Sequence, residues 1–289
     1  MKSFCIKTNN EDILDYLLSR TKEIDFEDLT YSKNEFKIYQ NVIIHYEGKD
    51  EESFSYFLSE LITEVILEFY EEKLIYQILN YNYFYFDEYE RIQICNNCMN
   101  TIENDYMEVE ENRKNINRKQ MIQKSLVSFI QENKSMILDG FVNFRLKEYI
   151  SYLDNIVDTA VNQFIIEKEY NEFINLLKIY IDSKPAECEI LHLIYINGES
   201  ILLDADKNIV SVSENILNSK YLSDISFSSN DFALNTLLTL LPAKVEMHVI
   251  GIEDEFIETI KQIFEGRVSV CKDCNICRTY RLLNHAKIE

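Results

Sequence analysis

Proline and glycine are scarce in this chain, which has 2 prolines and 5 glycines among 289 residues. So few turn-forming residues argue against flexible linkers and against an all-β fold of many strands, and they favour long helices. The glycines stand singly, so there is no glycine-rich loop that could cradle a phosphate, and the sequence also lacks a nucleophile elbow. Without a recognisable catalytic motif, the sequence favours a non-enzymatic protein.

Basic residues are also few. The chain has 29 Lys and Arg residues against 50 Asp and Glu residues, which gives a net charge of −21. Such a molecule repels phosphate backbones and anionic lipid surfaces, so we expect no general nucleic-acid binding. The one basic run, RKNINRK at residues 113–119, is interpreted as a solvated connector between helices.

Long apolar runs are missing as well. No apolar segment with a cleavage site follows the N-terminus, and Glu60, Glu64 and Glu68 interrupt the most apolar early helix. We therefore expect a cytoplasmic protein with no membrane span. The 7 cysteines are an odd number, and in a reducing cytosol they are better explained as buried thiols or metal ligands than as disulfides.

Apolar residues at helical spacing dominate the middle of the chain. One helix is predicted over residues 51–79, a second from a D-x-x-E capping signature at residues 87–90, and a third over residues 117–131. The aromatic run at residues 81–86 is expected to pack down on the core. The acidic residues expected opposite the buried stripe of the first helix are Glu60, Glu64, Glu68, Glu71 and Glu72.

The longest apolar pattern covers residues 139–181, and we expect it to be the centre of the fold. Asp139 is placed to cap this helix, which would be roughly 65 Å long if unbroken, so a bend or break is expected at residues 166–170. Asn143 and Arg145 lie near its start. Arg145 is either a partner contact or a buried salt-bridge anchor, and the second is favoured because the chain offers many carboxylates. The one-sided apolar residues are Leu146, Tyr149, Leu153, Ile156, Ala160 and Phe164.

Both ends of the chain carry strand patterns. At the N-terminus the predicted order is strand, helix, strand, strand, over residues 3–7, 11–19, 36–39 and 42–46. After Pro185, strands at residues 190–196 and 200–203 flank Asn197 and Gly198, a pair that is typical of a two-residue hairpin. The further elements predicted there are a strand at 209–212, a helix at 231–240, a strand at 244–250, a helix at 254–264 and a strand at 267–270.

These patterns predict an α+β fold, with a predominantly helical middle domain between a small N-terminal βαββ unit and a C-terminal mixed α/β domain. The expected divisions are residues 1–48 for the βαββ unit, 49–183 for the helical domain and 184–289 for the mixed domain. The mixed domain carries a cluster of cysteines.

Cys271, Cys274 and Cys277 have C-x2-C-x2-C spacing directly after a predicted strand. Thiolates at this spacing converge on one ion or cluster when the loop curls, so zinc or an iron–sulfur cluster is the candidate cofactor. A closed zinc site needs a fourth ligand. It could come from His285, Cys5, Cys188 or another chain, or the site could stay open; the alternative is three uncoordinated thiols.

The remaining cysteines and histidines favour structural roles. Cys95 and Cys98 form a CxxC pair, but they lie on or beside an apolar helical face and are interpreted as buried thiols. His45, His192 and His248 each fall in a predicted strand without a motif for zinc hydrolysis, so they too are interpreted as structural or surface residues.

Part of the central stretch carries a family resemblance. The run LDGFVNFRLKEYI, followed by IIEKEYNEFINLL, resembles the YtxC family of sporulation proteins of endospore-forming bacteria. The likeness continues more loosely to the terminal VSVCKDCNIC and is weak before Ile137. The resemblance implies an association with sporulation but no catalytic residues. We therefore expect a sporulation-associated protein that acts through a protein partner, with metal or iron–sulfur binding as the alternative.

Overall fold

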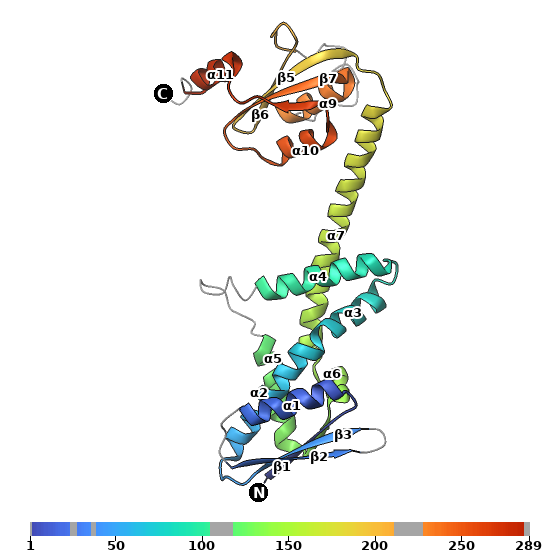
Figure 1. Cartoon of the computed structure of the whole chain (residues 1–289), viewed down its shortest axis with the longest axis vertical. Coiled ribbons are helices and arrows are strands. Elements are labelled where there is room, and N and C mark those ends of the chain that lie inside the picture. The colour runs from blue at the N-terminus through green and yellow to red at the C-terminus, as the bar shows by residue number, and fades with distance from the viewer. Residues whose placement is uncertain (1, 24–27, 36–38, 105–117, 211–227, 286–289) are drawn as a thin grey trace. The chain divides into compact units, whose positions relative to one another are not determined.

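The computed structural model describes residues 2–23, 28–35, 39–104, 118–210 and 228–285. The described residues form ten helices and two four-stranded sheets (Figure 1), so the predicted α+β class is confirmed. The chain divides into two compact units, Met1–Ile165 and Ile166–Glu289. The expected three-part division at residues 48 and 183 stays a prediction. Among the described residues, no helix combines the length and the apolar character that crossing a bilayer requires.

A mixed sheet lies at the start of the first unit, with strand order β2-β3-β1-β4. Its one parallel pair is β1 with β4, so a short strand from the middle of the chain completes the sheet. Helix α1 (Glu11–Glu23) lies over the face on which period-2 alternation buries Phe4, Ile6, Val42 and Ile44. The strands are β1 (Lys2–Thr8), β2 (Leu29–Glu35), β3 (Gln40–Tyr46) and β4 (Ser135–Ile137).

The predicted βαββ order is present, but the second strand is β2 rather than the segment at residues 36–39. Of that segment, residues 36–38 lie outside the described residues, and Tyr39 is not in a strand.

The helix predicted over residues 51–79 is wrong as a single element, because it breaks at Tyr70. The backbone of Tyr70 leaves ideal helical geometry, at φ −118° and ψ −26°, and its phenol donates a 2.7 Å hydrogen bond to Asp139 Oδ1. The break also turns Glu71 inward, where its side chain is buried instead of lying on the acidic face. The helices that result are α2 (Glu51–Phe69) and α3 (Glu71–Asn82), followed by α4 (Glu88–Asn104) and α5 (Arg118–Glu132).

The central stretch forms two helices, α6 (Leu138–Arg145) and α7 (Lys147–Asp182). The break predicted at residues 166–170 is wrong, since α7 is helical throughout; the chain breaks instead at the buried Leu146, with φ −95° and ψ 41°. Asp139 is not the helix cap, because Ile137 holds that position. The Asp139 carboxylate lies in the first turn and accepts the bond from Tyr70.

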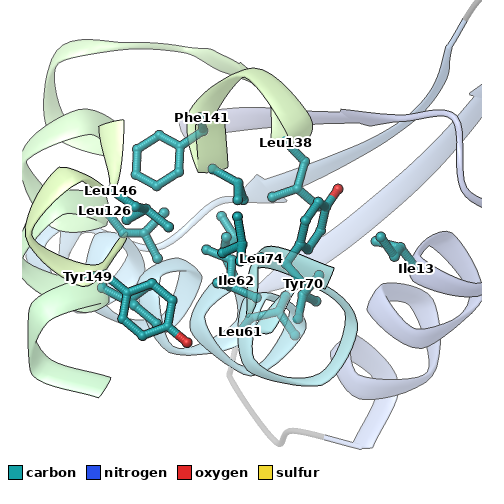
Figure 2. Close-up of a cluster of buried hydrophobic side chains, with 14 of the residues drawn as sticks. Ile13, Leu61, Ile62, Tyr70, Leu74, Leu126, Leu138, Phe141, Leu146 and Tyr149 are labelled. Atoms are coloured by element: carbon teal, nitrogen blue, oxygen red, sulfur yellow. The ribbon is translucent and has the colours of Figure 1, made fainter. Parts of the chain in front are cut away.

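One continuous apolar core holds the first unit together. Figure 2 shows Leu61 and Ile62 of α2 and Leu126 of α5 gathered with Phe141 and Leu146, all of them buried. Each aliphatic side chain of this size contributes about 1.5–3 kcal/mol when fully buried. The apolar periodicity of the middle of the chain therefore becomes the main source of stability for this unit.

For the connector between α3 and α4, one prediction is confirmed and one is wrong. The capping signature is confirmed, because the Asp87 N–H donates to Glu90 Oε2 and the Glu90 N–H donates to Asp87 Oδ1. The aromatic run before it does not pack down as a whole. Phe86 is buried, but Tyr81 and Phe84 are 86% and 74% exposed.

The second unit is built on a sheet with strand order β6-β5-β7-β8. The predicted hairpin is confirmed: Asn197 and Gly198 have φ values of 50° and 87° and join two antiparallel strands. The strand expected at residues 209–212 appears as a single bridge from Ile209 to Leu203, and residues 211 and 212 lie outside the described residues. The strands are β5 (Cys188–Ile196), β6 (Glu199–Leu203), β7 (Pro242–Ile250) and β8 (Val268–Val270).

Helices cover both faces of this second sheet. On one face, α9 (Ser229–Leu240) and α10 (Glu255–Ile263) pack in a core with Leu193 and Met247. On the other face, α11 (Asn275–His285) packs through Ile276 and Tyr280. Helix α11 was not predicted from the sequence. Because side chains alternate along β5 and β7, His192, Glu246 and His248 all lie on the face that α11 covers.

Candidate metal centre

The structure brings the three predicted cysteines together in the turn between β8 and α11. Cys271 follows the last residue of β8, and its N–H donates to the Met247 carbonyl at 2.8 Å, which holds it beside β7. Cys274 precedes α11 and Cys277 lies in its first turn. The Cys274 and Cys277 sulfurs are 3.8 Å apart, and the Cys277 and Cys271 sulfurs are 3.9 Å apart.

His248 supplies a fourth donor atom. Its Nδ1 lies 3.4 Å from Cys277 Sγ and 3.5 Å from Cys274 Sγ, and these donor atoms and Cys271 Sγ all lie within 4.8 Å of one another. His248 and Cys277 are each 1% exposed. The interpretation of His248 as an ordinary structural histidine therefore missed its place in this cluster, which is a group that could hold a metal ion.

The other candidates for the fourth donor within the chain are Cys188, Cys5 and His285. Cys188 Sγ is 3.6 Å from the Leu240 carbonyl oxygen and is not among the clustered donors. Cys5 lies on β1 in the first unit. The side chain of His285 is outside the described part of the chain.

Strand pairing explains how His248 reaches the cysteines. In the parallel pair of β7 and β8, Met247 is opposite Val270, so the next residue of each chain segment, His248 and Cys271, also come close. Met247 points into the core with α9 and α10, and alternation sends His248 to the α11 side. Chain reversal after Cys271 then brings Cys274 and Cys277 over the imidazole.

Ion pairs connect the turn that carries the cysteines to α11. Asp273 accepts hydrogen bonds from Arg278, at 3.3 and 3.2 Å, and from Arg281, at 3.1 Å. The Arg278 N–H donates to the Cys274 carbonyl at 3.0 Å, so Cys274 is the residue just before α11 whose carbonyl accepts a hydrogen bond from the first turn of the helix. The turn is therefore fixed at both ends, by the sheet through Cys271 and by the helix through Cys274.

The surroundings of the cluster lower the pKa values of Cys274 and His248, which favours the deprotonated forms that can bind a metal. Burial raises the pKa of Cys274, but the backbone N–H groups of Cys277 and Ile276 and the neighbouring thiols outweigh it, so the net pKa is lowered. Burial and His192 lower the pKa of His248 against the opposing charge of Glu246. Cys271 behaves differently: burial and the two nearby thiols raise its pKa to about 12. Three sulfurs that crowd one another favour a shared cation.

The other predicted site residues lie in the first unit. Asp139 and Asn143 line a pocket of about 210 Å³ together with Lys73. Arg145 is exposed, so its interpretation as a buried salt-bridge anchor is wrong, and its role as a partner contact stays a prediction.

A partly buried ion pair of the first unit uses Arg118 instead. Its guanidinium pairs with Glu71, whose carboxylate also accepts a hydrogen bond from the Tyr149 phenol. Burial raises the pKa of Glu71, and the two partners partly offset that effect. Helical spacing alone puts Glu71 on the solvated face, so the sequence pattern does not predict this group.

The prediction for Cys95 and Cys98 is confirmed. Their side chains are 4% and 0% exposed on α4, and burial raises their pKa values to about 11 and about 12. Buried thiols with such raised pKa values are inert.

Comparison with known proteins identifies relatives of the chain. The model of the YtxC-like family matches residues 56–269, so the likeness reaches much further toward the N-terminus than Ile137. The uncharacterized protein YtxC of Bacillus subtilis (strain 168) is 22% identical over 214 residues, which are 74% of this chain and 76% of that protein. No solved structure matches. His248 lies within the matched residues, whereas Cys271, Cys274 and Cys277 lie just beyond them.

Proposed function

The chain belongs to the YtxC-like family, and for this member we propose that His248, Cys271, Cys274 and Cys277 hold one zinc ion in a closed structural site. Three thiolates and one imidazole make a complete tetrahedral ligand set, so no position stays open for a substrate. The ion would stabilise the fold of the second unit and would take no part in a reaction.

The observation that carries this proposal is the spacing of the donor atoms. A tetrahedral ion with Zn–S bonds of about 2.3 Å and Zn–N bonds of about 2.1 Å holds sulfurs about 3.8 Å apart and the nitrogen about 3.6 Å from each sulfur. In this structure the sulfurs of two thiol pairs are 3.8 and 3.9 Å apart, and Nδ1 of His248 is 3.4 and 3.5 Å from two of the sulfurs. The side chains therefore surround a space that suits one such ion.

The same distances disfavour an iron–sulfur cluster. In a [4Fe–4S] cluster each thiolate binds a different iron, and in a [2Fe–2S] cluster the four ligands bind in pairs to two irons, so the four donor atoms do not all lie as close together as they do around a single ion. The fourth donor is also a nitrogen that lies almost in contact with two of the sulfurs. One zinc ion accounts for this arrangement better than several bridged irons.

The packing of α11 explains why an ion would be needed. This helix has 11 residues, and among its described side chains Ile276 and Tyr280 pack with the small apolar cluster of Ile194, Leu203 and Ile250. So small a core contributes little stability, and small domains compensate with metal sites that supply folding free energy directly. The zinc ion would fasten the turn and α11 to β7.

Metal analysis of protein purified without oxygen tests the proposal. We expect one zinc per chain, little iron and no acid-labile sulfide. Cys277→Ser should lose most of the zinc, whereas Cys188→Ser, which changes a half-buried thiol of the same unit outside the cluster, should keep it. A folded wild-type preparation with far less than one metal ion per chain would contradict the proposal.

The second candidate is a cytosolic, sporulation-associated protein that acts through a protein partner. The observation that favours it is the exposure of Phe144, at 74%, beside the exposed Arg145 in the family-like segment. Aromatic and arginine side chains are the residues that most often dominate binding at protein interfaces. An open groove of about 820 Å³ lies in the same unit, lined in part by Leu74, Tyr81 and Ile150.

Complementation in an endospore-forming host tests this second candidate. Deletion of the gene should lower the yield of spores, and a chain with Phe144→Ser and Arg145→Glu should accumulate normally without restoring the yield. Phe84→Ser is the matched control, because Phe84 is also 74% exposed but lies in the aromatic connector. Wild-type sporulation after clean deletion would contradict the sporulation role.

A further inference from the structure

The imidazole of His248 has two nitrogens with different neighbours. Nδ1 faces the thiols of Cys274 and Cys277, while Nε2 lies 3.1 Å from Nδ1 of His192. His192 is on β5, next to β7 in a parallel pair, and both histidines are buried, at 8% and 1% exposure. Water therefore has little access to the nitrogen that faces away from the thiols.

We propose that His192 is a positioning residue for the metal centre, because its Nδ1 accepts a hydrogen bond from Nε2–H of His248. This inference rests on the proposed zinc site. A neutral imidazole has one N–H, and a metal ion on Nδ1 leaves that proton on Nε2. The bond to His192 thus fixes the tautomer in which Nδ1 presents its lone pair to the cysteines.

Burial makes this partner important. A buried N–H without an acceptor is unfavourable, so a metal-bound His248 with no partner at Nε2 would be strained toward the wrong tautomer or a rotated ring. Metal-ligating histidines generally donate their second N–H to a neighbouring acceptor for this reason. Here the acceptor is another imidazole, held on an adjacent strand and therefore rigid.

Glu246 lies on the same face, and its Oε2 is 3.5 Å from His192 Nδ1. The same three side chains could instead hold a second cation, since His192, Glu246 and His248 also offer donor atoms within 4.8 Å of one another. That arrangement would require His248 to lose its last N–H, and it predicts two metal ions per chain.

Paired variants of His192 test the proposal in the zinc-loaded full-length protein. His192→Leu removes the acceptor, and we expect zinc affinity, measured by competition with a chelator, to fall about 10- to 100-fold. His192→Asn can place an amide oxygen where Nδ1 lies, and it should keep the affinity within about threefold of wild type. His45→Leu, on the sheet of the first unit, is the control and should leave zinc affinity unchanged.

Nitrogen NMR of the wild-type protein gives an independent readout that needs no variant. The zinc form should show His248 protonated at Nε2 and metal-bound at Nδ1, with a coupling through the hydrogen bond to His192. Protonation at Nδ1, two zinc ions per chain, or unchanged affinity in a folded His192→Leu variant would overturn the proposal. If the wild-type protein binds no zinc at all, the proposed function itself fails, so the two failures are distinguishable.

Discussion

The two units of this protein bury polar side chains in opposite ways. In the first unit, the carboxylate of Glu71 is enclosed by the Arg118 guanidinium and the Tyr149 phenol, so charge and hydrogen bonds are balanced within the chain. In the second unit, three thiols and an imidazole have donor atoms within 4.8 Å of one another, and four of the separations between them are 3.4–3.9 Å. The comparison illustrates two ways to stabilise a group of polar side chains in a protein interior: with partners from the same chain, as around Glu71, or with a bound ion, as we propose for His248 and the three cysteines.

Removal of zinc should have the largest effect. If the second cluster needs an ion, stripping the metal with a chelator should lower the free energy of unfolding of the second unit by on the order of 5 kcal/mol or more. Urea titration with hydrogen exchange as the readout should locate the loss around α11 and β7, and leave the first unit unchanged. Equal stability with and without metal would remove the contrast between the units.

Substitution of Glu71 should have the next largest effect. Glu71→Ala removes the buried carboxylate that pairs with the Arg118 guanidinium and accepts from the Tyr149 phenol, so the free energy of unfolding of the first unit should fall by about 3–5 kcal/mol. Glu72→Ala, at the exposed next position, is the matched control and should cost no more than about 0.5 kcal/mol. Denaturant unfolding measures both variants, and similar small losses would mean that the cluster of the first unit is not balanced as described.

The rate of alkylation of Cys95 and Cys98 tests whether these two thiols are buried. Because burial raises the pKa values of Cys95 and Cys98 to about 11 and about 12, few of these thiols are ionised at pH 8. We expect alkylation of both by iodoacetamide to be at least about 100-fold slower in the folded protein than in urea. Mass spectrometry of the modified peptides follows the rates, and fast labelling of the folded chain would show that α4 is open.

The bond between Tyr70 and Asp139 should have the smallest effect. Tyr70→Phe removes the 2.7 Å hydrogen bond to the carboxylate and should lower the free energy of unfolding by about 1–2 kcal/mol. Tyr56→Phe changes a 54% exposed tyrosine of α2 and should cost no more than about 0.5 kcal/mol. A Tyr70→Phe loss as small as the control would mean that the break between α2 and α3 is held by apolar packing alone.

Local patterns predicted much of the fold. The positive φ values of Asn197 and Gly198, the reciprocal bonds of Asp87 and Glu90, and the burial of Leu146 and Tyr149 all follow from residue type and spacing. The wrong predictions share a cause. Tyr70, Glu71 and Asp139 are partners of residues more than 45 positions away, and a local pattern does not contain such contacts.

The same distinction between local pattern and long-range contact holds for the candidate site. The sequence by itself determined the α+β class, the apolar helices and the three cysteines, because helical periodicity and C-x2-C-x2-C spacing are properties of neighbouring residues. Only the tertiary structure decided that His248 joins them, because the pairing of β7 with β8 sets Met247 opposite Val270 and thereby brings the next residues together. It likewise placed His192 behind His248, since strand order comes from long-range pairing and packing and not from any one segment.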